Sequence, residues 1–151
     1  MAGIHIEVEI QGDKEIGRKL RAMGVAALNL TAGMKDVGSY LTGLFSGEVF
    51  ASRGGIIDKA WAPLSDRYAA HKAKLYPGRP PLIRTGVMNR SYQFDATRSE
   101  VQISNPTKQF VFTQLGTRRM PARPTMGLVQ PQERRVVEIL SRDITEQIRR
   151  A

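Results

Sequence analysis

The chain has 151 residues and carries 23 Lys and Arg side chains against 14 Asp and Glu, which gives a formal net charge of +9. This length fits a single domain over residues 1–151, and the hydrophobic share of 41% is that of a globular protein rather than a disordered or fibrous one. The chain has no cysteine and only two histidines, so disulfide scaffolds, thiol catalysis, zinc ribbons and multi-histidine metal sites are excluded. We expect neither a metal nor a cofactor.

No segment of the sequence predicts a membrane span or a secretion signal. The longest uncharged stretch is residues 22–34, which is shorter than the about 20 apolar residues that cross a bilayer. The first five residues lack the basic and apolar regions of a signal peptide. We therefore expect no membrane partner and a protein that works in a cytosol-like compartment.

The positive charge is concentrated in the middle and at the end of the chain. Residues 52–98 have a net charge of +6 and residues 118–151 of +4, whereas residues 1–51 have a net charge of −1. A patch of this kind can face nucleic acid or an acidic protein. A solvated basic surface without a partner is the alternative interpretation.

The first third of the chain predicts a strand followed by helix. Residues 4–10 alternate apolar and polar side chains, which is typical of a half-buried strand, and Asp13 can cap the next element. Apolar residues then recur at three- and four-residue steps over residues 16–50, which indicates a helical stripe. Glycines at positions 17, 24, 33, 38 and 43 interrupt this stripe. Either they divide it into two helices near residues 31–33, with Thr31 as the second cap, or they permit close packing.

The middle of the chain is rich in glycine and proline and poor in apolar residues. Ser65 can cap a short helix over residues 66–74, in which Tyr68 and Leu75 supply the main apolar side chains. A loop region of this length is unusual unless it is functional or disordered. We therefore expect residues 52–82 to form a long extended arm that becomes ordered on a partner.

The last third predicts two strands and a long helix. Residues 90–94 and 101–104 are expected to form strands joined by a polar connection. Residues 110–115 are apolar and either helical or extended, and Gly116 ends them. Pro131 can occupy the first turn of a final helix, which has an apolar stripe. That stripe comprises Val136, Val137, Leu140, Ile144 and Ile148. The whole pattern predicts an α+β fold with a small mixed or antiparallel sheet packed by two to three helices.

The sequence contains no enzyme signature. His5 lies on the polar face of the first expected strand and His71 in the short helix, and neither has a nucleophile beside it in a known pattern. The spacing of Asp58, Asp66 and Asp95 does not bring their carboxylates together, as a metal-dependent nuclease would need. A Walker-type phosphate loop is also missing.

Aromatic residues lie among the basic residues of the middle segment. Trp61 and Tyr68 have Lys and Arg neighbours, as in proteins that stack single-stranded nucleic acid. Large aromatic side chains are also the usual anchors of protein interfaces. We favour the second interpretation, in which both residues pack the arm onto a core or onto a neighbouring molecule.

Four short motifs follow one another along the chain: WAPLS at residues 61–65, LIRTGVMNRS at 82–91, FTQLGT at 112–117 and ARPTMGL at 122–128. Their order resembles the phage virion morphogenesis family, the tail-completion proteins of Mu-like and P2-like phages. The resemblance covers residues 50–150 by motif and the earlier residues by general layout.

The sequence departs from the family pattern at three motif positions. Thr113 stands where the family has a histidine, Thr125 where it has an aromatic residue, and Met88 where it has a leucine. All three are conservative for packing. The first of them makes a histidine-dependent role untenable in this chain.

The resemblance implies a structural role. Proteins of this family are small α+β proteins that assemble as rings at the head–tail junction, finish the tail or join it to the head, and are not enzymes. The implied partners are further copies of the chain and other neck and tail proteins, such as the tail tube and connector, with packaged DNA as a further non-specific contact. The implied location is the virion, with the host cytoplasm during assembly.

On this hypothesis two groups of residues form the functional surfaces. The first is an oligomer or partner interface made of Trp61, Leu64, Tyr68, Arg84, Thr85 and Gly86, in which the glycine allows a tight turn. The second is a basic loop that faces a partner or DNA, made of Arg118, Arg119 and Arg123. The alternative for Gly86 is an ordinary turn, and the alternative for the three arginines is a solvated loop. The alternative function is a basic nucleic-acid-binding module, whose affinity falls steeply with salt.

Overall fold

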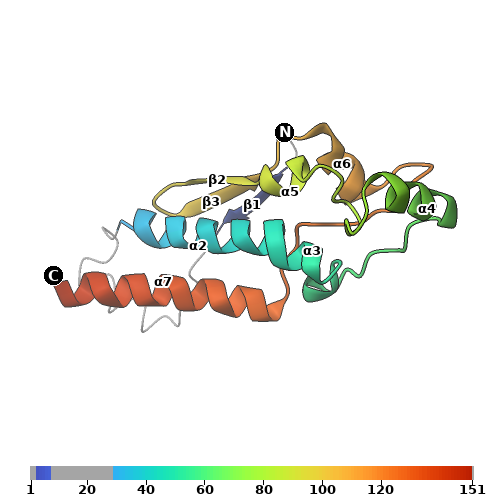
Figure 1. Ribbon diagram of the computed structural model, residues 1–151. Coiled ribbons are helices and arrows are strands. Elements are labelled where there is room, and N and C mark those ends of the chain that lie inside the picture. The colour runs from blue at the N-terminus through green and yellow to red at the C-terminus, as the bar shows by residue number, and fades with distance from the viewer. Residues whose placement is uncertain (1–2, 8–28, 151) are drawn as a thin grey trace.

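A computed structural model of the protein describes residues 3–7 and 29–150 (Figure 1). In chain order the elements are β1 (Gly3–Glu7), α2 (Thr31–Gly43), the π-helical turn η2 (Leu44–Glu48), α3 (Val49–Ala51), the 3₁₀ turn η3 (Gly55–Ile57), α4 (Asp66–Leu75), α5 (Val87–Arg90), β2 (Gln93–Ala96), β3 (Glu100–Ser104), α6 (Lys108–Leu115) and α7 (Gln130–Arg150). Helices and an antiparallel sheet combine in one α+β arrangement, as the sequence predicts. Figure 1 shows the sheet, α2 and α7 as successive layers.

The sheet has the strand order β1-β3-β2, and both pairings are antiparallel. In the central strand, Ile103 pairs with Ile4 of β1 on one side and with Phe94 of β2 on the other. The first expected strand is confirmed over Gly3–Glu7. Its remaining residues, the Asp13 cap and the first half of the helical stripe lie outside the described residues.

The long helix in the middle layer follows the predicted apolar period. It runs from Thr31 through the π-helical turn to Ala51. Because α2 contacts both the sheet and α7, side chains on two of its faces are excluded from water. The fully buried side chains that it and its continuation supply are Met34, Val37, Leu41, Phe45 and Val49. Thr31 is not the cap that we expected, because its backbone N–H instead donates to the side chain of Asn29.

One glycine of this helix allows close packing, which was one of the two predicted alternatives. A Cβ atom on Gly38 would lie 2.2 Å from the ring of Phe94 on β2. The ring therefore occupies the space that any other residue would fill, and the helix approaches the sheet at this point.

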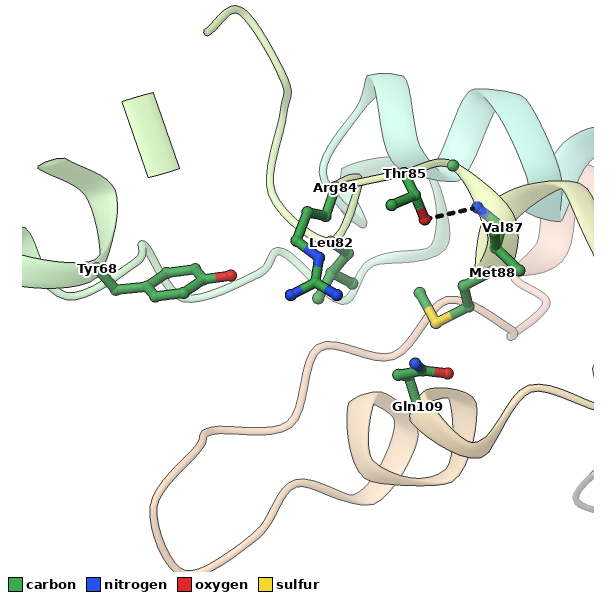
Figure 2. Close-up of a pocket in the computed structure, with 8 residues that line it drawn as sticks. Tyr68, Leu82, Arg84, Thr85, Val87, Met88 and Gln109 are labelled. Carbon is green, nitrogen blue, oxygen red and sulfur yellow. Dashed lines mark hydrogen bonds between the residues drawn. The ribbon is translucent and has the colours of Figure 1, made fainter. Parts of the chain in front are cut away.

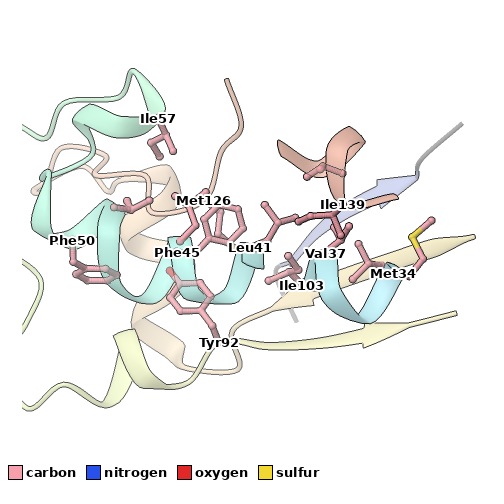
Figure 3. Packing of buried hydrophobic residues seen from close by; sticks show 14 of the residues in the cluster. Met34, Val37, Leu41, Phe45, Phe50, Ile57, Tyr92, Ile103, Met126 and Ile139 are labelled. Carbon is pink, nitrogen blue, oxygen red and sulfur yellow. The ribbon is translucent and has the colours of Figure 1, made fainter. Parts of the chain in front are cut away.

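The core joins the long helix to the C-terminal helix, the sheet and the loops beyond them (Figure 3). From α7 it takes Val136, Ile139 and Leu140, which are spaced as one helical face. Val137, which we placed in this stripe, is 59% exposed because it lies one residue off that face. Tyr92 contacts the rings of both Phe45 and Phe110, with centroids 6.2 and 6.0 Å apart.

Burial of Tyr92 makes the protein less stable at high pH. Desolvation raises the pKa of Tyr92 to about 12, while the neighbouring Thr125 hydroxyl, which can donate a hydrogen bond to the ionised oxygen, acts in the opposite direction. An unfolded tyrosine ionises near pH 10. As the pH rises from 10 to 12 the unfolded state therefore loses a proton that the folded state retains, and the free energy of unfolding falls.

We expect the wild-type protein to lose about 1 kcal/mol more stability between pH 9 and pH 11 than a Tyr92→Phe variant does. Urea unfolding of both proteins at the two pH values measures this difference. The phenylalanine variant is the control, because every other titratable group is present in both proteins. Equal losses would mean that Tyr92 ionises in the folded protein as it does in the unfolded chain.

The strand expected at residues 90–94 begins later than predicted. Gly86 has a φ of 81°, and the chain then makes the one-turn helix α5 before β2 starts at Gln93. The side chain of Arg90 closes this turn by donating to the carbonyls of Gly86 and Thr85. The turn motif therefore extends into residues that we assigned to the strand.

The segment expected to be an arm ordered by a partner is instead packed against its own chain near its start. The indole N–H of Trp61 donates to the carbonyl of Pro124 at 2.7 Å, and its ring meets Phe50 edge-on at 5.4 Å. Packing onto its own chain is one of the two placements that we expected for Trp61, and ordering of the arm by a partner stays a prediction. The following helix α4 begins at the predicted cap Ser65, whose hydroxyl accepts from the N–H of Tyr68.

Candidate partner-binding groove

Three of the four sequence motifs are joined by hydrogen bonds between segments that lie far apart in the chain. The guanidinium of Arg123 donates to the carbonyls of Ala62 and Pro63, at 2.8 and 2.9 Å. The side-chain oxygen of Gln114 accepts from the backbone N–H groups of Thr125 and Met126. Residues 61–65 are thus held by residues 122–128, which are held in turn by α6.

The remaining motif is attached to this unit through Met88 on α5. The Met88 carbonyl accepts a hydrogen bond of 2.8 Å from the side-chain amide of Asn105. Its sulfur lies 3.8 Å from the hydroxyl of Thr113 on α6. Both side chains are buried, so α5 and α6 pack directly against one another here.

Arg123 does not belong to the basic loop in which we placed it. Only 4% of its surface is exposed, because its guanidinium is directed inward to the two carbonyls. Arg118 and Arg119 are exposed, as expected for a loop that faces a partner. They lie in a tight turn in which the N–H of Thr117 donates to the carbonyl of Met120 at 2.8 Å. The sequence offers no local sign of the difference, because all three arginines are in one proline-containing basic stretch.

Two adjoining hollows open beside α4. The first has a volume of about 300 Å³, and the residues lining it include Tyr68, Leu82, Arg84, Thr85, Gly86 and Val87 (Figure 2). The second has a volume of about 650 Å³, and the residues lining it include Leu64, Tyr68, Leu82, Arg119, Met120 and Arg123. Since Tyr68 and Leu82 line both, we treat the two hollows as one feature and call it the groove.

The groove collects most of the residues expected at an interface. Leu64, Tyr68, Arg84, Thr85 and Gly86 all line it. Trp61 does not line it, because its indole instead contacts Pro124 and Phe50. Figure 2 shows Tyr68 and Arg84 directed toward one another from α4 and from the turn. The expected turn at residues 84–86 is present, and its glycine has the left-handed φ that such a turn needs.

The charge of the groove is positive. Arg84, Arg119 and Arg123 contribute to its lining, and no Asp or Glu is among the residues that line either hollow. The guanidinium carbon of Arg84 lies 5.8 Å from the centroid of the Tyr76 ring. This cation–π contact orients the side chain while leaving its N–H donors available.

A second surface, on α6, was missed by the sequence analysis. This helix buries Phe110 and the polar Thr113, whereas Phe112 is 53% exposed and Leu115 is 77% exposed. The two exposed side chains are three residues apart and therefore lie on the same face. The structure explains this exposure, because Gln114 faces inward to hold residues 122–128 and leaves Phe112 and Leu115 on the outward face.

In residues 3–7 and 29–150 no three His, Asp or Glu side chains come together where a metal ion could be held. Among the helices in those ranges, none is both long and apolar enough to cross a membrane. Comparison of the whole chain with models of protein families, with curated proteins and with solved structures finds no match.

Proposed function

We propose that the protein is a structural component of a phage virion at the head–tail junction, where it assembles as a ring that caps the tail and joins it to the head. One observation carries the proposal. The four motifs that resemble the phage virion morphogenesis family, although dispersed over some seventy residues, meet in space as one connected, partly buried network. Their polar groups are used to hold the chain in shape, which suits a structural rather than a catalytic protein.

The departures from the family pattern also support this proposal. Thr113, in place of the histidine, lies against Met88, which stands in place of the leucine. Thr125, in place of the aromatic residue, accepts the hydroxyl hydrogen bond of Tyr92. Each departure is thus matched by a partner that fills or satisfies the same position. Such pairing is expected where motif positions serve packing.

The exposed face of α6 is our candidate for the contact between subunits, and its occupant is a second copy of the chain. Full burial of side chains such as Phe112 and Leu115 is worth about 1.5–3 kcal/mol each. A ring needs a contact between two different surfaces of neighbouring subunits, so this face must meet another surface of the next copy. Apolar contacts of this kind depend little on salt.

We expect light scattering to give one discrete mass, several times that of the chain, at both low and high salt. A Phe112→Asp/Leu115→Asp variant is expected to be monomeric with unchanged circular dichroism. Val137→Asp, which places a charge at a similarly exposed apolar position on α7, is the control and should keep the wild-type mass. A monomeric wild-type protein at both salt concentrations would contradict self-assembly. Trp61→Ala is unsuitable here, because the indole supports its own chain.

Binding of nucleic acid is the second candidate function, and it is favoured by the exposed Arg84, Arg118 and Arg119. Binding of this kind neutralises phosphates and therefore weakens steeply as salt is raised. Titration with duplex DNA at two salt concentrations separates it from the ring, whose mass should not change.

A further inference from the structure

We propose that the groove docks an extended acidic segment of another protein, with one apolar side chain between carboxylates. The inference rests on the proposed function in one respect: it names the surface by which a junction protein would hold a partner other than its own copies. It is carried by the shape, the charge and the backbone of the groove.

The shape of the groove suits an apolar side chain within an extended segment. The two hollows have volumes of about 300 and 650 Å³ and share two lining residues, so a chain could run from one to the other. Leu64, Leu82 and Met120 line them with aliphatic surface. Concave apolar sites with a few polar groups are the usual form of a binding pocket.

The positive charge of the groove favours carboxylates on either side of the apolar residue of the bound segment. Arg84 lies in the first hollow and Arg119 in the second, and both are exposed. Because no acidic side chain lines either hollow, a bound carboxylate would meet guanidinium groups without competition from the groove itself. Arginine binds carboxylates through paired hydrogen bonds, which gives direction as well as attraction.

The backbone at the centre of the groove is held in an unfavourable conformation. Leu82 has a φ of 63°, in the left-handed region that residues other than glycine seldom adopt. This is the residue that lines both hollows together with Tyr68. Strain of this kind gathers at binding sites, where the surrounding structure holds a side chain in place.

The walls of the groove are fixed before any partner binds. Arg123 holds the chain at residues 62–63, and the ammonium of Lys72 on α4 donates to the carbonyl of Pro80. Gly116 has a φ of 72°, and a Cβ there would lie 2.7 Å from the backbone nitrogen of Ala122. A preformed site keeps more of its interaction energy for binding.

A protein segment fits these features better than nucleic acid does. Stacking of bases needs aromatic platforms, and Tyr68 is the one aromatic side chain among the lining residues of the two hollows. A duplex could meet the arginines through its phosphates, but it has no apolar group that would enter a hollow lined by leucine and methionine.

The test uses three fluorescein-labelled probes with the full-length protein: the peptide EDELDE, the same peptide with serine in place of leucine, and a 20-base-pair DNA duplex. We expect the leucine peptide to bind at least about 10-fold more tightly than the serine peptide. An Arg84→Gln/Arg119→Gln variant should bind it at least about 10-fold more weakly. Arg134→Gln/Arg149→Gln on α7 removes the same charge from exposed positions and is the matched control, which should bind as the wild type does.

A Leu82→Gly variant separates binding from folding. Glycine relieves the left-handed φ but removes a side chain that packs against the core, and these two effects oppose one another. We therefore expect thermal stability to change little while affinity for the leucine peptide falls at least about 5-fold. Equal binding of the leucine and serine peptides would overturn the proposal, and so would tighter binding of the duplex that is lost with the two arginines. Light scattering of the wild-type protein is an independent readout. A monomeric wild type that binds the leucine peptide counts against the proposed assembly and leaves the groove standing.

Discussion

Replacing Arg123 with methionine is expected to lower the free energy of unfolding by about 3 kcal/mol. Methionine keeps most of the apolar stem but leaves the carbonyls of Ala62 and Pro63 without the donors that now satisfy them. Arg123 itself is only 4% exposed, so its removal empties a site that water reaches poorly, although the carbonyl of the exposed Pro63 can be solvated in part. In a chain of this length such a loss lowers the melting temperature by roughly 6–12 °C.

Two further variants make this measurement specific. Arg119→Met removes the same charge from the exposed turn nearby and is expected to change stability by less than about 0.5 kcal/mol. Arg123→Lys should fall between the two, because an ammonium group cannot span two carbonyls as the planar guanidinium does. Chemical denaturation of the three variants gives the order. Equal stabilities of the two methionine variants would mean that Arg123 contributes no more than a surface side chain.

The regular elements could be predicted because their patterns are local. The long helix, α7 and the central strand each have a hydrophobic period that is visible within a short window of sequence. The π-helical turn and the late start of β2 could not be read in this way. The second depends on Gly86 and on hydrogen bonds from Arg90, which extend a turn into residues that look like a strand.

The intrachain contacts of the arm could not be predicted because they join residues that are distant in sequence. Trp61 and the carbonyl that it binds are separated by 63 residues, and Arg123 and Ala62 by 61. A sparse, proline-rich segment therefore looks detached although the fold supplies its contacts. The same distance explains why Arg123 could not be told from the two exposed arginines before it. No single motif shows which segments it contacts; the contacts become visible only when the motifs are placed together in space.

Several residues of the groove were named from the sequence, but the contacts that bring them together were not. Leu64, Tyr68 and Arg84 were chosen as members of an arm and of a turn, and the structure brings them to one surface. The left-handed Leu82 was not anticipated, because leucine gives no sign of a positive φ. The outward face of α6 was missed for the opposite reason. An apolar run is usually assigned to the core, and here the polar Thr113 and Gln114 take the inward positions.

Replacing Gln114 with leucine is expected to lower the free energy of unfolding by about 2–4 kcal/mol. The side-chain oxygen of Gln114 accepts from the N–H groups of Thr125 and Met126 and from the Thr125 hydroxyl, and leucine leaves all three without that acceptor. Both of those residues are almost completely buried, at 0% and 3% exposure, so the donors have little access to water. The loss should therefore be visible locally as well as globally.

Hydrogen–deuterium exchange tests the local effect of this substitution. In Gln114→Leu we expect faster exchange of the amides in residues 122–128, with little change in the sheet. Gln114→Glu keeps an acceptor oxygen and should preserve most of the protection. Gln109→Leu, at an exposed position on the same helix, is the control for added apolar surface and should leave both stability and exchange unchanged. If Gln114→Leu exchanges like that control, the loop is held by its apolar contacts, and the hydrogen bonds that join the motifs are not what keeps the second hollow of the groove in shape.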